Sequence, residues 1–228
     1  MLRYSVFLLF LILTIPSVAS VASATPISEA ETVANDLNNA KFYYDRANAK
    51  LASGDKEGAI EDYSRAIKFD PKNPSLYNNR GLAKYALGNY QGAVEDYSRA
   101  IAIAPNATSP YTNRGLAKSA LGNHQGAIED HSRAIKFDPN NAGAYYNRGL
   151  TKSDLGNYQG AIEDYSRAIK FDPNDSQAYW FRSISRYELG DKQGSIADLI
   201  KLAKVFRQQG QMDKYQATMR LIERARSR

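Results

Sequence analysis

The chain has 228 residues, of which 43% are hydrophobic and 24% charged, proportions that are ordinary for a compact domain or a modest repeat array. Its formal net charge is +6, and charges of both signs alternate along the sequence, so no single basic stripe is obvious. Cysteine is absent, which excludes disulfides, thiolate catalysis, cysteine metal sites and a lipid-anchored cysteine at an export junction.

Residues 1–24 are expected to be a signal peptide and not part of the fold. Arg3 precedes a short apolar run over residues 6–15, and small residues follow up to Ala22-Ser23-Ala24. Signal peptidase requires small side chains at such a site, so the sequence predicts cleavage after Ala24 and a secreted or periplasmic mature protein. The alternative is an uncleaved N-terminal membrane anchor, although the apolar run is shorter than the roughly 20 residues that span a bilayer.

Residues 25–39 are either an N-terminal cap or a linker. Ser28 and Glu31 fit a capping box, in which two side chains satisfy free backbone amides at the start of a helix. A helix is therefore expected to start near Glu29 and lead into the next segment, unless residues 25–38 form a loose linker.

From residue 40 the sequence repeats with a period of 34 residues. Arginine and glycine recur at this step, and so do alanine and proline. The arginines are Arg46, Arg80, Arg114, Arg148 and Arg182, and the glycines are Gly54, Gly88, Gly122, Gly156 and Gly190. The sequence therefore contains five units, over residues 40–73, 74–107, 108–141, 142–175 and 176–210.

Each unit is expected to form two helices. In the second unit these cover residues 76–87 and 91–103, with apolar residues at helical spacing. Gly88 separates them, because glycine accepts the left-handed conformation that follows a helix end. Pro105 ends the second helix, because proline has no amide hydrogen and its ring clashes with the preceding turn.

The fifth unit lacks the terminal proline, so its second helix is expected to continue to about Gln208 and to break at Gly210. Residues 211–228 are then predicted to be a single capping helix, since the outermost hairpin of a repeat array needs a cover with a polar outer face. Its apolar side would carry Met212, Tyr215, Met219 and Ile222.

The unit YNNRGLAKYALGNYQGAVEDYSRAIAIAP resembles the tetratricopeptide repeat, TPR. Tyr77, Gly81, Gly88, Ala93, Tyr97, Ala100 and Pro105 fall on the offsets at which that family places an aromatic residue, two glycines, an alanine, an aromatic residue, an alanine and a proline. The resemblance implies an all-α fold, a right-handed α-solenoid of five TPR helical hairpins plus the C-terminal capping helix. The Asn-Arg-Gly and Glu-Asp-Tyr-Ser-Arg-Ala-Ile segments are similar to repeats common in cyanobacterial proteins, which suggests an exported array of that type.

The arginines at the 34-residue step are a departure from that family, which often has leucine there. An aspartate follows each of them by sixteen residues: Asp62, Asp96, Asp130, Asp164 and Asp198. We predict an Arg–Asp pair between the two helices of every hairpin, since a half-buried arginine without a partner would be destabilising. These arginines are therefore assigned to structure and not to ligand binding.

The resemblance also implies a concave groove lined by the first helix of each hairpin, which binds a protein or peptide partner. A column of asparagines there suits an extended peptide, because a side-chain amide can donate to a backbone carbonyl and accept from a backbone N–H. The alternative is that these asparagines bond between adjacent hairpins or face water. The candidate peptide-binding residues are Asn79, Asn113, Asn147, Asn48, Tyr44, Asn78, Tyr146 and Trp180. The full basic set with which some relatives grip a C-terminal carboxylate is missing.

Catalysis is not expected, and neither a catalytic nor a metal site nor a cofactor is predicted. His124 and His131 stand where other units have packing tyrosines, and the repeated Glu-Asp pairs are adjacent on a helix, so they point about 100° apart. A small-molecule substrate is not expected, nor a stable membrane span after signal cleavage. The rival functions are nucleic-acid binding, permitted by a pI near 9.3 but opposed by balanced charges in each unit, and self-assembly through poorly capped ends.

Overall fold

The computed structural model describes residues 29–226, so the predicted signal peptide and Ser28 lie outside the described residues. The described part consists of α-helices, turns and short connections, without strands. The helices are α1 (Glu29–Ala52), α2 (Lys56–Phe69), α3 (Pro74–Ala86), α4 (Tyr90–Ile103), α5 (Thr108–Ala120), α6 (His124–Phe137), α7 (Ala142–Asp154), α8 (Tyr158–Phe171), α9 (Ser176–Glu188), α10 (Lys192–Gln208) and α11 (Met212–Arg226).

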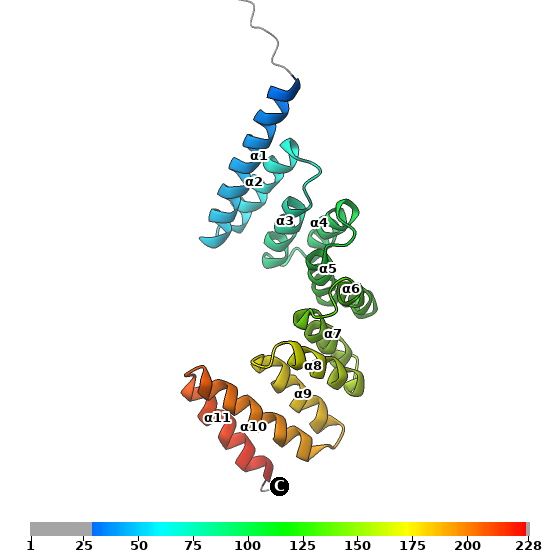
Figure 1. Cartoon of the computed structure of the whole chain (residues 1–228), viewed down its shortest axis with the longest axis vertical. Helices are drawn as coiled ribbons and strands as arrows, with labels where there is room; N and C mark the ends of the chain where they lie inside the picture. The colour runs from blue at the N-terminus through cyan, green and yellow to red at the C-terminus, as the bar shows by residue number, and fades with distance from the viewer. Residues whose placement is uncertain (1–28, 227–228) are drawn as a thin grey trace, which may run out of the picture.

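Consecutive helices pack as five hairpins, α1–α2, α3–α4, α5–α6, α7–α8 and α9–α10, and α11 packs alone against α10. Each hairpin also contacts the next through its second helix, so the hairpins form one curved stack from α1 to α11 (Figure 1). The predicted all-α solenoid of five hairpins and a C-terminal helix is confirmed.

The first helices lie on the inner side of this curve. α3 contacts α5, α5 contacts α7 and α7 contacts α9, whereas no contact of that extent joins successive second helices in residues 29–226. In a bent stack the elements at the inner radius are closest together. The face built by α1, α3, α5, α7 and α9 is therefore the concave one.

The turns within and between hairpins follow from local sequence. Gly88 has a φ of 79°, a left-handed conformation that suits glycine, and it closes α3. Asn89 then caps α4, because its side-chain oxygen accepts a hydrogen bond of 3.0 Å from the backbone N–H of Gly92. Pro74 occupies the first turn of α3, where its missing N–H costs nothing, so this helix starts two residues earlier than predicted.

The core between the helices combines small residues with one buried ring in each of the first four hairpins, and Leu199 takes this position in the fifth. Ala93 and Ala100 are completely buried, and the Tyr97 ring is buried beside them. The α-carbon of Gly81 lies so close to this ring that a β-carbon there would be 2.7 Å from Tyr97 Cε1. Tyr77 is half-buried, and its hydroxyl donates to the Pro71 carbonyl at 3.1 Å.

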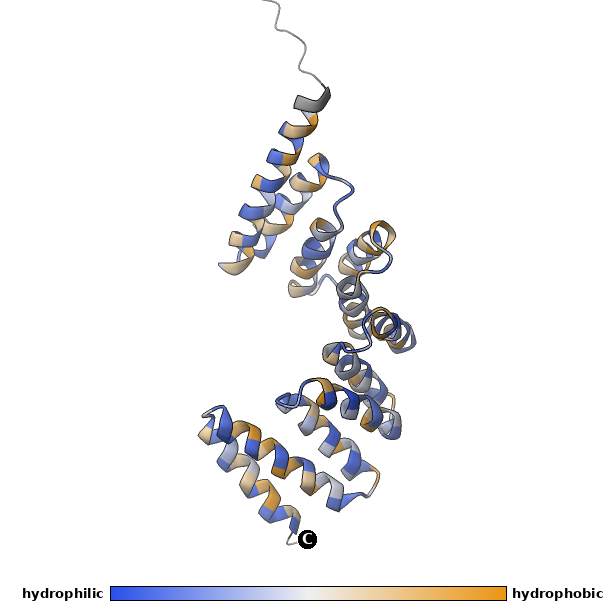
Figure 2. Cartoon of the chain, in the orientation of Figure 1, coloured by the Kyte–Doolittle hydropathy of each residue, from blue (hydrophilic) through white to orange (hydrophobic). Residues whose placement is uncertain are grey.

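The last two helices close the stack with a larger apolar contact. Leu199, Leu202 and Ala203 of α10 are buried against Ile222 of α11, with Tyr215 and Met219 packed around them. Figure 2 shows apolar and polar residues alternating along both helices. Met212 is exposed, so the apolar side of α11 starts one turn later than the sequence suggested.

At the other end, α1 is continuous from Glu29 to Ala52, so residues 29–38 are helical and not a loose linker. The start of α1 extends beyond the end of α2 (Figure 1). Val33 and Leu37, in the first half of α1, are exposed.

Candidate functional site

The concave face carries a chain of side-chain amides that crosses the first three hairpins. Asn113 Nδ2 donates to Asn78 Oδ1 at 3.0 Å, Asn78 Nδ2 donates to Asn79 Oδ1 at 3.2 Å, and Asn79 Nδ2 donates to Tyr44 Oη at 3.4 Å. The predicted asparagines of units two and three therefore do bond between adjacent hairpins. Each amide has two N–H donors and an oxygen with two lone pairs, so these bonds leave donors and acceptors for a ligand.

Asn48 belongs to a different environment from the rest of the predicted set. Its Oδ1 accepts a 2.6 Å hydrogen bond from the hydroxyl of Tyr63 within the first hairpin. Tyr63 is completely buried, and burial raises the pKa of its hydroxyl above the ordinary value. Asn48 thus satisfies a buried phenol, and its Oδ1 is committed to the hairpin core.

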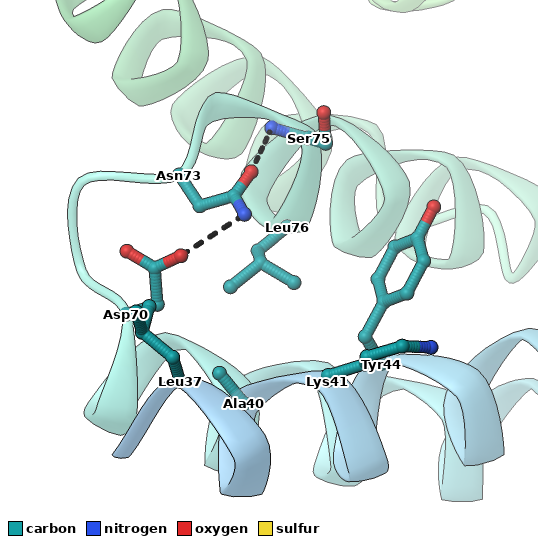
Figure 3. A pocket seen from close by; sticks show the side chains of 8 residues that line it. All are labelled: Leu37, Ala40, Lys41, Tyr44, Asp70, Asn73, Ser75 and Leu76. Atoms are coloured by element: carbon teal, nitrogen blue, oxygen red, sulfur yellow. Dashed lines mark hydrogen bonds between the residues drawn. The ribbon is translucent and has the colours of Figure 1, made fainter. Parts of the chain in front are cut away.

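A pocket of about 400 Å³ opens beside Tyr44, between α1 and the start of α3 (Figure 3). Leu37, Tyr44 and Leu76 supply apolar surface, and Lys41 lies on the same face of α1. Asn73 caps α3 at the opposite wall, accepting from Ser75 N and donating to Asp70 Oδ2. This end of the groove offers both an apolar floor and charged groups.

The middle of the groove is hollowed between α5 and α7. A pocket of about 310 Å³ there is lined by residues that include Tyr85, Leu116, His124, Asn147, Leu150 and Asp154. Asn147 of the fourth unit thus lines a pocket between first helices. Tyr146 precedes Asn147 in the chain. It stands at the position that Asn78 has in the second unit, where Asn78 links Asn113 to Asn79.

Tyr146 joins an aromatic cluster towards the C-terminal part of the groove. The centroid of its ring lies 6.1 Å from the ring centroid of Phe181 and 6.1 Å from that of Tyr165. The Tyr165 ring is stacked on the Phe181 ring, with 6.3 Å between their centroids. Burial among these rings raises the pKa of Tyr146 to about 12, so the hydroxyl stays protonated at neutral pH. Trp180, the neighbour of Phe181, has 37% of its surface exposed and lines a further pocket of about 380 Å³ between α9 and α11.

The predicted Arg–Asp pairs lie behind this face in all five hairpins. Arg80 donates to both carboxylate oxygens of Asp96, at 2.9 Å from Nε and 2.6 Å from Nη2. Equivalent pairs join Arg46 to Asp62, Arg114 to Asp130, Arg148 to Asp164 and Arg182 to Asp198. The hydrogen bonds from Arg46 lower the pKa of Asp62 to about 2, against the opposing effect of burial. The arginines are therefore structural, as expected.

A second cation beside all five Arg–Asp pairs, and a serine beside four of them, were missed by the sequence reasoning. Lys84, one turn after Arg80, brings its ammonium 2.8 Å from Asp96 Oδ2, and the other hairpins have Lys50, Lys118, Lys152 or Arg186 there. Arg80 Nη1 also donates to Ser64 Oγ of the preceding hairpin at 3.0 Å. Both groups recur at the 34-residue step, and a lysine four residues after an arginine shares its helix face. That spacing was the available signal.

The two histidines have structural surroundings. His131 takes the place of the core tyrosine in the third hairpin, is completely buried, and neither ring nitrogen has a hydrogen-bond partner among the described residues. Burial lowers its pKa to about 4, so the ring is neutral at pH 7. His124 is half-buried at the start of α6, with Nδ1 3.4 Å from Ser119 Oγ.

Residues 29–226 contain no group of three or more His, Asp or Glu side chains placed to hold a metal ion. Over the same residues, no helix combines the length and the hydropathy needed to cross a bilayer.

Family models match this chain over much of the repeat region. A TPR repeat model matches residues 47–88 and 119–156, and a tetratricopeptide repeat model matches residues 74–107 and 142–175. Together these matches cover residues 47–107 and 119–175, a little over half of the chain. No curated protein matches the sequence significantly.

Solved structures with a similar fold include a MamA protein, 25% identical with a TM-score of 0.67, for which the match covers 76% of this chain and 94% of the other. A second is YrrB, described as a TPR protein with an unusual peptide-binding site, at 16% identity, a TM-score of 0.61 and coverage of 77% and 91%. A third is the first TPR of Spaghetti bound to the HSP90 peptide SRMEEVD, at 28% identity, a TM-score of 0.51 and coverage of 53% and 95%.

Proposed function

The chain belongs to the tetratricopeptide repeat family, and from this membership we propose that it is a non-enzymatic scaffold that binds an extended peptide or partner protein in its concave groove. The observation that carries the proposal is the row of amides from Asn113 through Asn78 and Asn79 to Tyr44. This row is held in place before a ligand arrives, because its members bond to one another across neighbouring hairpins. Pre-positioning lowers the entropic cost of ordering side chains on binding.

The chemistry of the row fits a peptide backbone better than a particular side chain. Donors and acceptors alternate along the groove, and an extended peptide presents backbone N–H and C=O groups in alternation. Sequence preference would then come from the pockets beside Tyr44, Asn147 and Trp180. The peptide-bound Spaghetti structure supports this reading, since a related array holds a peptide.

The proposal is tested by affinity capture from envelope extracts with the chain from residue 25 onward as bait. A second bait carries Asn79, Asn113 and Asn147 changed to Ala. A matched control bait changes Gln91, Gln125 and Gln159 to Ala, since these amides are exposed, have the same 34-residue spacing, and lie on the second helices. We expect the asparagine bait to lose partners that the first and control baits retain. If all three baits retained the same partners equally, binding through the asparagines of the concave groove would be refuted.

Two other functions predict different outcomes with the same protein. A nucleic-acid-binding array would be retained on immobilised DNA with a steep dependence on salt concentration. A self-assembling array would sediment as larger species at higher protein concentration, since exposed Val33 and Leu37 lie at one end of the stack. We do not expect nucleic-acid binding, because positive and negative charges nearly cancel within each inner hairpin. We do not expect self-assembly through the ends, because the amide row lies on the side of the array.

We further propose that the scaffold acts outside the cytoplasm, after removal of residues 1–24. The support is the apolar run over residues 6–15 with small residues at the expected cleavage site. Mass spectrometry of the protein recovered from its native host would give a chain that begins at Thr25. Recovery of the uncleaved chain in the membrane fraction would favour the anchored alternative. The likeness to cyanobacterial arrays stays a prediction.

A further inference from the structure

The C-terminal end of the groove differs from the rest in charge. α10 and α11 together contain eight lysines and arginines but only three acidic residues. One of the three, Asp198, is buried and already paired with Arg182 and Arg186 of α9. The other two acidic residues within these helices are Asp213 and Glu223. Most of the chain's net charge of +6 is therefore concentrated on its last two helices.

The same end holds a pocket with aromatic and aliphatic walls, about 380 Å³ in volume, where α11 takes the position of a next first helix. Trp180 and Phe181 of α9 form one wall, Leu202 and Phe206 of α10 the floor, and Leu221 of α11 the other wall. Trp180 and Leu221 are more than a third exposed, although large apolar side chains are usually buried. The pocket can therefore take a large apolar side chain from outside.

The one charged residue that lines this pocket is Lys214. Its ammonium lies 5.6 Å from the centre of the Phe206 ring, at the border between the aromatic floor and solvent. The remaining lining residues, Ser176, Gln177, Ala217 and Thr218, are neutral. An apolar group that enters this pocket thus meets a cation at its rim and no acidic lining residue.

We propose that this pocket, named here the α9–α11 pocket, anchors an acidic segment of a partner protein through one large apolar residue flanked by Asp or Glu. The apolar residue fills the space between Trp180 and Leu221, and a neighbouring carboxylate pairs with Lys214. An acidic peptide fits better than an anionic membrane, because the apolar surface is recessed between two helices, whereas membrane-binding helices present a protruding apolar face. This inference rests on the proposed scaffold function and assigns one anchor of its ligand.

Trp180 makes the test direct, because it is the only tryptophan of the chain and lies in the pocket wall. Three short synthetic peptides serve as probes: one with a central Phe flanked by Asp and Glu, one with Asn and Gln in place of the acids, and one with Ala in place of Phe. Each is titrated into the chain from residue 25 onward while Trp180 emission is followed. We expect the acidic Phe peptide to shift the emission, and both other peptides to bind about tenfold more weakly or worse.

Two variants examine the pocket itself. Lys214→Glu should weaken the acidic peptide about tenfold and reduce the salt dependence of binding. Lys68→Glu is the matched control, since Lys68 is exposed on α2 at the far end of the array, and binding should be unchanged. Ala217→Phe should also abolish the shift, because it fills the pocket from an exposed position of α11 while circular dichroism stays helical.

The outcomes separate this inference from the scaffold function. Equal binding of the acidic and neutral peptides, or equal effects of Lys214→Glu and Lys68→Glu, would overturn it. So would an emission shift that anionic lipid vesicles produce and the acidic peptide does not, since the surface would then be a membrane site. If partner capture still depends on the asparagines while the α9–α11 pocket ignores acidic peptides, the scaffold function stands and this assignment falls.

Discussion

Arg80 and Asp96 meet between the two helices of the second hairpin, joined by two parallel hydrogen bonds of 2.9 and 2.6 Å. The carboxylate is nearly buried, and Lys84 approaches it from the next turn of α3 at 2.8 Å. A buried carboxylate held by two cations is a costly group to leave without partners, so this cluster fixes how the two helices of a hairpin are paired.

Asp96→Ala should therefore destabilise the array strongly, by about 3–5 kcal/mol, because Arg80 and Lys84 are left facing each other without a counter-charge. Urea denaturation followed by circular dichroism measures the loss. The control is Glu95→Ala, which removes an exposed carboxylate one residue earlier on the same helix and should change stability by less than about 0.5 kcal/mol. Similar losses in both variants would mean that the cluster is not the source of stability.

The buried imidazole of His131 predicts a specific dependence of stability on pH. Its pKa is about 4 in the folded chain, below the ordinary value of 6.5, so the unfolded state binds the proton more tightly. The stability is therefore fully present above pH 6.5 and decreases as the pH falls towards 4, by about 3 kcal/mol in total. Thermal unfolding at a series of pH values measures this decrease.

His131→Tyr should abolish that decrease, since Tyr63, Tyr97 and Tyr165 fill the equivalent position and do not gain a proton in this range. His124→Tyr, which matches Tyr90 and Tyr158, is the control and should retain the pH dependence. The Asp62 carboxylate, with a pKa of about 2, loses its contribution only between about pH 4 and 2. A slope between pH 6.5 and 4 that survives His131→Tyr would contradict this assignment.

The close approach of Gly81 to Tyr97 predicts opposite effects of two glycine substitutions. Gly81→Ala places a methyl group 2.7 Å from Tyr97 Cε1, so the ring must shift and we expect a loss of about 1–3 kcal/mol. Gly143→Ala adds a methyl group in the exposed first turn of α7, 3.5 Å from the nearest side-chain atom, and should stabilise by up to about 1 kcal/mol. Differential scanning calorimetry would record Tm shifts of opposite sign, and equal shifts would argue against the contact.

The contact between successive hairpins through Arg114 and Ser98 predicts a change in cooperativity. Arg114 Nη1 donates to Ser98 Oγ at 3.0 Å, and Ser98→Ala leaves that donor unpaired at a cost of about 1 kcal/mol. Because stability in such arrays is a sum of unit and interface terms, the interface between the second and third hairpins should weaken selectively. Hydrogen exchange should speed up in α4 and α5 more than in α9. Ser109→Ala, at an exposed position of α5, should leave exchange unchanged.

The sequence predicts most of the fold because the packing is local and repeated. Glycine after each first helix and the small residues at Ala93 and Ala100 determine one hairpin, and the period of 34 then applies it five times. The Arg–Asp pairs were predictable because both partners recur in every unit. One exception lies at an end of the array, where Met212 of the terminal helix is exposed.

The candidate site was predictable only in part. The position of the asparagines on the concave face follows from the repeat register, but their partners depend on side-chain distances between units. Asn48 illustrates the difference, since its own hairpin brings it to 2.6 Å from the Tyr63 hydroxyl, whereas Leu82 stands at its position in the second unit. The α9–α11 pocket was not foreseen, because α11 has no counterpart in the repeat from which to read its contacts.

The serine that accepts a hydrogen bond from the arginine of the following hairpin affects how a repeat array of this kind can lengthen. Ser64, Ser98, Ser132 and Ser166 each accept a hydrogen bond from the arginine of the following hairpin, whereas the fifth unit has Ile200 at this position. An inner unit thus has both the arginine that donates to the preceding hairpin and the serine that accepts from the following one. A duplicated copy inserted between residues 74 and 175 would therefore find a hydrogen-bond partner on either side. A copy appended after α10 would meet isoleucine instead, so growth by internal duplication is chemically easier than growth at the end.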